Sequence, residues 1–230
     1  MADSAPAVSG RQLPLWARLP IAVGSGTLMA LGMAPYDLWY LALGGLVVAM
    51  VLFKASPGGV RAVGTGWAVG LGYFGLALGW IIEPFMVDAA TTGWMAPFAL
   101  VGMAGGLALF WALPFWGAAH AGRYALPALV TGWAASELAR GYVLTGFPWA
   151  LVSYIWAPVA PIQWVSVIGP FGLVFVTLAL AALCASALWR RCARRAVATV
   201  MVLAALFVGG WALTPPEQDL SSQPVVRLIQ

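Results

Sequence analysis

Apolar residues fill most of this chain, and short polar or Gly- and Pro-rich segments divide them into long runs. An α-helix needs about 20 apolar residues to cross a bilayer, and most of the runs are close to that length. Glycines inside the third run are tolerated in membrane helices and permit close helix–helix approach. We predict seven helices, at about residues 15–34, 38–53, 63–82, 94–119, 125–144, 162–188 and 196–213.

Composition narrows the class of protein. Of the 230 residues, 63% are hydrophobic and 8% are charged, whereas roughly a quarter of the residues in a soluble domain are charged. So few charges do not cover a water-facing surface, and so apolar a chain does not remain disordered. The expected fold is therefore an all-α integral membrane protein, a seven-helix transmembrane bundle over residues 1–213.

The end of the chain changes character. Residues 214–224 are polar and Pro-rich, which predicts an extracytoplasmic linker. Residues 225–230 form a short strand-like tail, and a lone strand does not satisfy its own backbone groups. We therefore expect the tail to be the truncated start of a soluble domain.

Charge position predicts orientation. If seven helices alternate, every Lys and Arg except Arg140 and Arg227 falls on one side. The other side receives five acidic residues: Asp37, Glu83, Asp88, Glu217 and Asp219. Basic loops remain cytoplasmic, so the amino terminus is expected inside and the carboxyl terminus outside. One alternative remains open: the first run is a cleaved signal peptide, with Arg11 and Arg18 as its basic region.

The strongest candidate for chemistry is the segment from Glu137 to Trp149. Glu137 and Arg140 are three residues apart and share a helix face. An unpaired charge in hydrocarbon costs about 3 kcal/mol, so the two are expected to bond each other or loop backbone, facing the bundle interior. The pair either organises a polar pocket for a lipid headgroup or substrate, or fixes helix register. Gly141, Gly146 and Pro148 predict a non-helical loop shielded from lipid.

Other polar residues carry weaker signals. Asp37 is expected to cap the second helix, and His120 has no second His or Cys nearby for a metal site. On one helix, Cys184 and Cys192 would be roughly 12 Å apart, too far for a disulfide. We predict no catalytic residue, cofactor or metal site. A group of acidic and aromatic residues flanks the outer loop between the third and fourth runs: Trp80, Glu83, Asp88 and Trp94. These residues either belong to a solvated loop or guide a lipid or a peptide amine.

Several segments resemble bacterial apolipoprotein N-acyltransferases. Residues 137–149, read as E-x-x-R-G-x-x-x-T-G-F-P-W, resemble an outer-face loop of that family. Residues 34–39 are similar to its first outer loop, and residues 66–80 to its Gly-rich third helix. Residues 225–230 resemble the first strand of the nitrilase-like domain that follows its membrane bundle. The resemblance covers essentially the whole chain.

The resemblance implies a multi-pass enzyme of the bacterial inner membrane, without a cofactor. Its partners would be a phospholipid acyl donor and a lipoprotein whose amino-terminal cysteine amine accepts the acyl chain, with no nucleic acid. The family's Glu-Lys-Cys triad lies in the nitrilase-like domain, so this chain is expected to be inactive alone, and no catalytic residue carries over. The residues that carry over as a substrate- and lipid-side scaffold are Glu137, Arg140, Gly146, Phe147, Pro148 and Trp149.

Two other functions remain open from the residues alone. One is a seven-helix transporter with the Glu137–Arg140 pair on its substrate path, although no convincing internal repeat supports it. The other is a noncatalytic, lipid-binding membrane scaffold.

Overall fold

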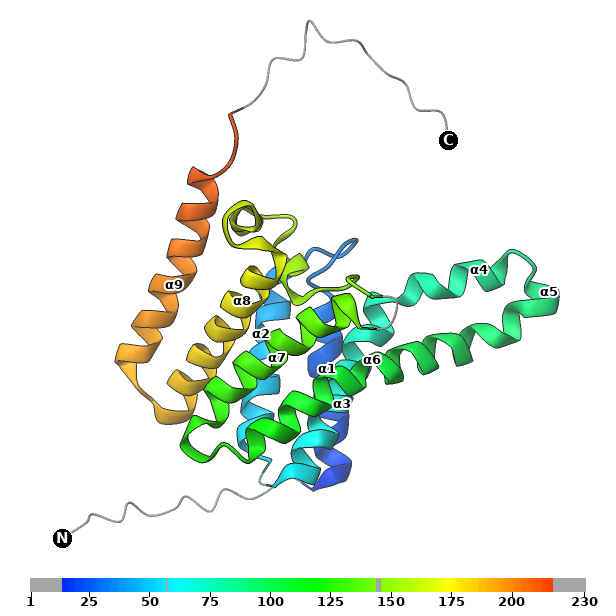
Figure 1. Cartoon of the computed structure of the whole chain (residues 1–230), viewed down its shortest axis with the longest axis horizontal. Helices are drawn as coiled ribbons and strands as arrows, with labels where there is room; N and C mark the ends of the chain where they lie inside the picture. The colour runs from blue at the N-terminus through cyan, green and yellow to red at the C-terminus, as the bar shows by residue number, and fades with distance from the viewer. Residues whose placement is uncertain (1–13, 57, 144–145, 217–230) are drawn as a thin grey trace, which may run out of the picture.

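The computed structural model describes residues 14–56, 58–143 and 146–216, and these residues form helices without a strand (Figure 1). The prediction of an all-α fold is confirmed for them. The tail 225–230 and most of the linker 214–224 lie outside the described residues. The long helices are α1 (Leu15–Ala30), α2 (Trp39–Lys54), α3 (Gly59–Ala77), α6 (Ala96–Ala119), α7 (Ala125–Tyr142), α8 (Val165–Arg190) and α9 (Ala193–Ala212).

Short helices fill the connections between them. The bounds are η1 (Gly79–Ile82), α4 (Glu83–Met86), α5 (Ala89–Thr92), η2 (Gly93–Met95), η3 (Gly122–Tyr124), η4 (Val152–Trp156) and η5 (Ala160–Trp164). Figure 1 shows α4 and α5 as an arm that extends away from the bundle. The acidic and aromatic group expected in an outer loop lies on and beside this arm, with all four side chains exposed.

Three helical segments are long and apolar enough to cross a membrane: Ala89–Ala119, Ala160–Arg190 and Ala193–Ala212. A fourth span results if α3 and the segment Gly79–Met86 are counted together, although the two are bent by 62°. This bend corrects the prediction of one continuous helix over 63–82. Helix α8 also contains a break, at Gly169, whose φ is +71°.

Close packing of α1 against α3 depends on glycine. A Cβ atom at Gly26 would lie 1.9 Å from the carbonyl oxygen of Val69, and one at Gly72 would lie 2.0 Å from that of Val23. Neither position accommodates a larger residue, so the two backbones are in direct contact at these points. This confirms the expected role of glycine in the third run.

The turns divide between the two ends of the bundle. Figure 1 shows the α2–α3, α6–α7 and α8–α9 connections at one end, and the loop that follows α7 at the other. The candidate segment therefore lies at the end opposite the turns that carry most of the basic residues.

Candidate functional site

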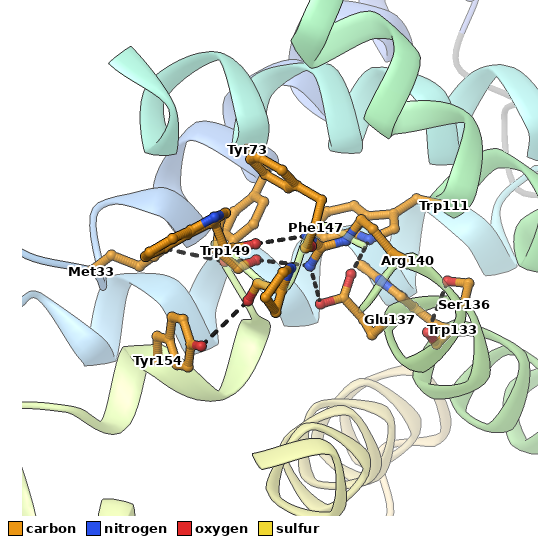
Figure 2. Close-up of polar contacts among 12 residues, drawn as sticks. Met33, Tyr73, Trp111, Trp133, Ser136, Glu137, Arg140, Phe147, Trp149 and Tyr154 are labelled. Carbon is orange, nitrogen blue, oxygen red and sulfur yellow. Dashed lines mark hydrogen bonds and ion pairs between the residues drawn. The ribbon is translucent and has the colours of Figure 1, made fainter. Parts of the chain in front are cut away.

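Glu137 and Arg140 form a buried ion pair near the carboxyl end of α7. Their exposed fractions are 0% and 1%, and Nη2 of Arg140 donates to Oε2 of Glu137 at 2.9 Å. The other carboxylate oxygen, Oε1, accepts a hydrogen bond from Nε1 of Trp111 on α6 at 2.7 Å. Figure 2 shows the two charged side chains pointing toward each other inside the bundle. The expected pairing and inward orientation are confirmed.

Arg140 also holds the loop that follows α7. Its Nη1 donates to the carbonyl oxygens of Phe147 and Trp149 at 2.7 and 2.6 Å, and its Nη2 donates to that of Ala150 at 3.2 Å. The planar guanidinium presents its donors in a fixed fork, so one side chain reaches all three carbonyls. The carbonyl of Arg140 in turn accepts the backbone N–H of Phe147 at 2.8 Å. The loop is therefore folded back onto the end of α7.

Gly146 permits this fold-back. Its φ is +73°, and a Cβ atom there would lie 2.6 Å from the carbonyl oxygen of Gly141. Gly141 itself is helical, which corrects its assignment to the loop. A Cβ on Gly141 would lie 3.1 Å from Phe171 of α8, so its small size serves helix packing. Thr145, part of the segment singled out from the sequence, lies outside the described residues.

Aromatic rings enclose the ion pair. The guanidinium carbon of Arg140 lies 5.2 Å from the centre of the Phe74 ring, within the range of a cation–π interaction. The rings of Tyr73 and Trp111 stack at 4.9 Å, and the Tyr73 hydroxyl donates to the carbonyl of Ala150 at 3.2 Å. Such apolar surroundings strengthen each hydrogen bond of the pair.

Trp111 and Tyr73 were missed by reasoning from the sequence. They are 26 and 77 residues from the groups they contact, on helices α6 and α3. One indication of such contacts was present in the sequence: a buried Glu137 carboxylate is costly, so it requires more than one hydrogen-bond partner.

Two side chains of the loop, Pro148 and Trp149, face away from the ion pair, whereas Phe147 also packs against the hydrophobic core. Trp149 is 61% exposed, Pro148 is exposed and Phe147 is half-buried. The Tyr154 hydroxyl donates to the carbonyl of Pro148 at 3.3 Å (Figure 2). The buried pair thus fixes the backbone, and the loop presents an apolar, aromatic surface outward. This arrangement suits contact with lipid or with another protein surface more than acid–base chemistry.

The remaining candidates lie apart from this site. Asp37 does not cap α2, because the capping position is Leu38 and it has no side-chain hydrogen bond. Asp37 instead adopts a φ of +57° in an exposed turn, which overturns that prediction. His120 ends α6, where its Nδ1 lies 2.8 Å from the carbonyl of Trp116. Across the described residues, no three His, Cys, Asp or Glu side chains gather as metal ligands.

Cys192 lies in the turn between α8 and α9, and both cysteines are free thiols. Hydrogen bonding with the Arg195 backbone, followed by that with Arg194 and by the charges of both arginines, lowers the pKa of the Cys192 thiol. Nothing in the structure connects this thiol with the loop site at the other end of the bundle.

Three or four of the apolar helical segments are long enough to span a bilayer. A buried ion pair shapes a loop at one end of the bundle. Together these features define a helical membrane protein. Residues 25–183 match the family model described as the apolipoprotein N-acyltransferase N-terminal domain. The chain belongs to this family.

Curated relatives agree. The apolipoprotein N-acyltransferase of Caulobacter vibrioides is 44% identical over 173 residues, which cover 72% of this chain and 32% of the relative. The enzyme of the same name from Rhodopseudomonas palustris is 37% identical over 174 residues, covering 72% and 32%. That from Rhizobium etli is 32% identical over 249 residues, covering 97% and 46%. The chain therefore spans between 32% and 46% of the length of these relatives.

Proposed function

We propose that this chain is the membrane portion of an apolipoprotein N-acyltransferase. In such an enzyme, an acyl chain from a phospholipid passes to the amino-terminal cysteine amine of a lipoprotein. The family match supports the reaction class. The chain matches between 32% and 46% of the length of these relatives, so we expect the reacting groups in the part of such an enzyme that the chain does not cover.

The observation that carries this proposal is the set of three carbonyls held by Arg140. The buried pair acts as a positioning device, and Gly146 permits the turn. Phe147, Pro148 and Trp149 then form a fixed apolar edge at the outer end of the bundle. A phospholipid in the outer leaflet would contact this edge on its way to the reacting groups.

The proposed topology has seven crossings, with the amino terminus cytoplasmic and the carboxyl terminus periplasmic. Each of the seven apolar runs overlaps one long helix, and the basic turns gather at one end of the bundle (Figure 1). Helix α2 has 16 residues, about 24 Å of rise, which is short for a hydrocarbon core of about 30 Å. Packing inside the bundle and flanking residues would accommodate that mismatch.

An acyl-transfer assay tests whether the reacting groups lie outside this chain. The 230-residue chain, reconstituted with phospholipid and a lipoprotein acceptor, should give no product above background. A rate close to that of a full-length relative from Caulobacter vibrioides assayed in parallel would contradict the claim that the reacting groups lie elsewhere.

Crosslinking tests the apolar edge. A phospholipid with a diazirine in its acyl chain should label the peptide containing Trp149, and Trp149→Ala should reduce that yield severalfold. Trp116 is comparably exposed, at 51%, near the opposite end of the bundle, so Trp116→Ala is the matched control. Equal yields from the two variants would contradict a lipid contact at this loop.

A further inference from the structure

A cavity of about 910 Å³ lies at the end of the bundle opposite the loop held by Arg140. Residues of α2, α7 and α8 line it, with Arg123 from η3 and Arg195 from α9. Its α7 lining runs from Leu126 to Thr131, which lie about 21 and 14 Å along the helix axis from Arg140 at 1.5 Å per residue. The cavity is therefore separate from the site described above.

The inner walls of this cavity are apolar. Val130 of α7 and Ala182 and Ala185 of α8 are buried in them, and Phe175 is partly exposed. A slot of this volume between two helices, lined by hydrocarbon, accommodates an acyl chain far better than a polar metabolite. Trp189 lies at the edge and is 54% exposed, a placement typical of tryptophan at the membrane–water interface.

The rim of the same cavity is cationic. Lys54 ends α2, Arg123 precedes α7, and Arg190 and Arg195 flank the α8–α9 turn. Among the described residues that line the cavity there is no Asp or Glu. Four positive charges from three separate turns thus surround the mouth of an apolar slot, and the lining supplies no countercharge.

We propose that this cavity binds an anionic phospholipid, with the phosphate at the four cations and an acyl chain between α7 and α8. Basic pockets between transmembrane helices on the cytoplasmic side are suited to such headgroups. A zwitterionic lipid is a poorer match, because its ammonium group would meet the same four cations. The leaflet assignment, which is the inner one, rests on the proposed topology; the binding chemistry does not.

This lipid is not the proposed acyl donor, because it lies at the opposite end of α7 from the apolar edge. It joins three turns that are distant in the sequence, so its expected effect is to stabilise the packing of α8 against α7 and α2. Binding of a ligand to the folded state alone raises the apparent stability.

Lipid retention by the purified 230-residue chain tests the proposal. The chain is delipidated in detergent and mixed with phosphatidylglycerol or with phosphatidylcholine of identical acyl chains, and bound lipid is counted by native mass spectrometry. We expect phosphatidylglycerol to bind with an affinity at least tenfold higher. Arg190→Gln/Arg195→Gln should lower that affinity about thirtyfold, equivalent to about 2 kcal/mol, because it removes two basic residues near the surface.

The matched control is Arg191→Gln/Arg194→Gln, which removes the same charge from the same turn but alters no residue that lines this cavity. It should retain the preference for phosphatidylglycerol. Ala182→Leu, which partly fills the slot without changing charge, should weaken binding, and glycerophosphoglycerol without acyl chains should not compete.

Three results would overturn the proposal. Equal affinity for the two phospholipids would mean that the cations do not select the ligand. Equal losses in the two double variants would mean that the net charge of the turn acts, not the cavity. Full competition by glycerophosphoglycerol would mean that the slot holds no acyl chain. All four of these arginines are at or near the surface, so the charge variants are expected to fold.

Discussion

A lysine in place of Arg140 would keep the positive charge but lose the planar fork that reaches three carbonyl oxygens and one carboxylate. Some of these carbonyls would then remain buried with a weaker partner. We expect Arg140→Lys to lower the free energy of unfolding by about 3 kcal/mol. Unfolding in mixed micelles with increasing dodecyl sulfate measures this. Arg123→Lys, at an exposed position, is the control and should change little.

A double-mutant cycle separates the ion pair from the loop contacts. Glu137→Gln alone leaves the Arg140 charge buried without a counterion, whereas Glu137→Gln with Arg140→Met removes both charges. The double variant should therefore be less destabilised than the sum of the two single variants. Simple additivity would show that the two side chains are energetically independent.

The Cys192 thiol should react at lower pH than an ordinary cysteine. Hydrogen bonding with the Arg195 backbone lowers its pKa, and the nearby arginine charges add to this, so more thiolate is present at neutral pH. The alkylation rate by iodoacetamide, measured from pH 6 to 10 in a Cys184→Ser background, should reach half its plateau below the midpoint of a free cysteine peptide. Arg194→Gln should move the midpoint upward. A midpoint equal to that of the peptide would contradict the assignment.

At the residue scale, the sequence predicted which charges must pair, because two buried charges three residues apart on one helix have few other partners. It did not predict Trp111 as the second partner of the carboxylate. That contact depends on the rotation of α6 against α7, which no local pattern specifies. Asp37 was assigned as a cap because its residue type favours that role, but the turn before α2 places Leu38 at the capping position instead.

At the scale of elements, glycine determines where α1 and α3 meet. Gly72→Ala would place a methyl group 2.0 Å from the carbonyl oxygen of Val23, so the helices must separate. We expect a loss of about 2 kcal/mol or more, comparable to overpacking of a core. Gly75, on the same helix, has no atom within 4 Å of a built Cβ. Gly75→Ala should be neutral or stabilising by about 0.5 kcal/mol, because alanine favours the helix.

Thermal unfolding of the two variants in the same detergent compares these effects. A loss in Gly75→Ala as large as that in Gly72→Ala would mean that helix propensity, not contact between backbones, decides the outcome.

The positions of the long helices could be predicted from the apolar runs, because the thickness of the hydrocarbon core sets the length of the run and of the helix that it forms. Breaks within them did not follow. The bend after Ala77 and the break at Gly169 occur inside continuous apolar sequence. Trp39 and Trp156 stack on each other at 5.8 Å, and Trp156 is fully buried. Hydropathy reports that a tryptophan avoids water, not which apolar surface it contacts.

For the whole molecule, the proposed topology predicts that residues 149 and 190 lie in different compartments. Fusion of alkaline phosphatase after residue 149 should give high activity in cells, because that enzyme folds outside the cytoplasm. Fusion after residue 190 should give low activity, and a green fluorescent protein fused there should fluoresce. The same compartment for both sites would refute seven alternating crossings.

The contacts from Arg140 to the loop end on backbone carbonyl oxygens, which every amino acid supplies. Substitutions at positions 147 and 149 would leave those bonds in place, while Gly146 remains required by its backbone angle. The backbone shape of this turn and the side chains on its surface can therefore change independently. Substitutions on the surface could suit a different lipid or protein partner while the buried Glu137–Arg140 pair stays the same.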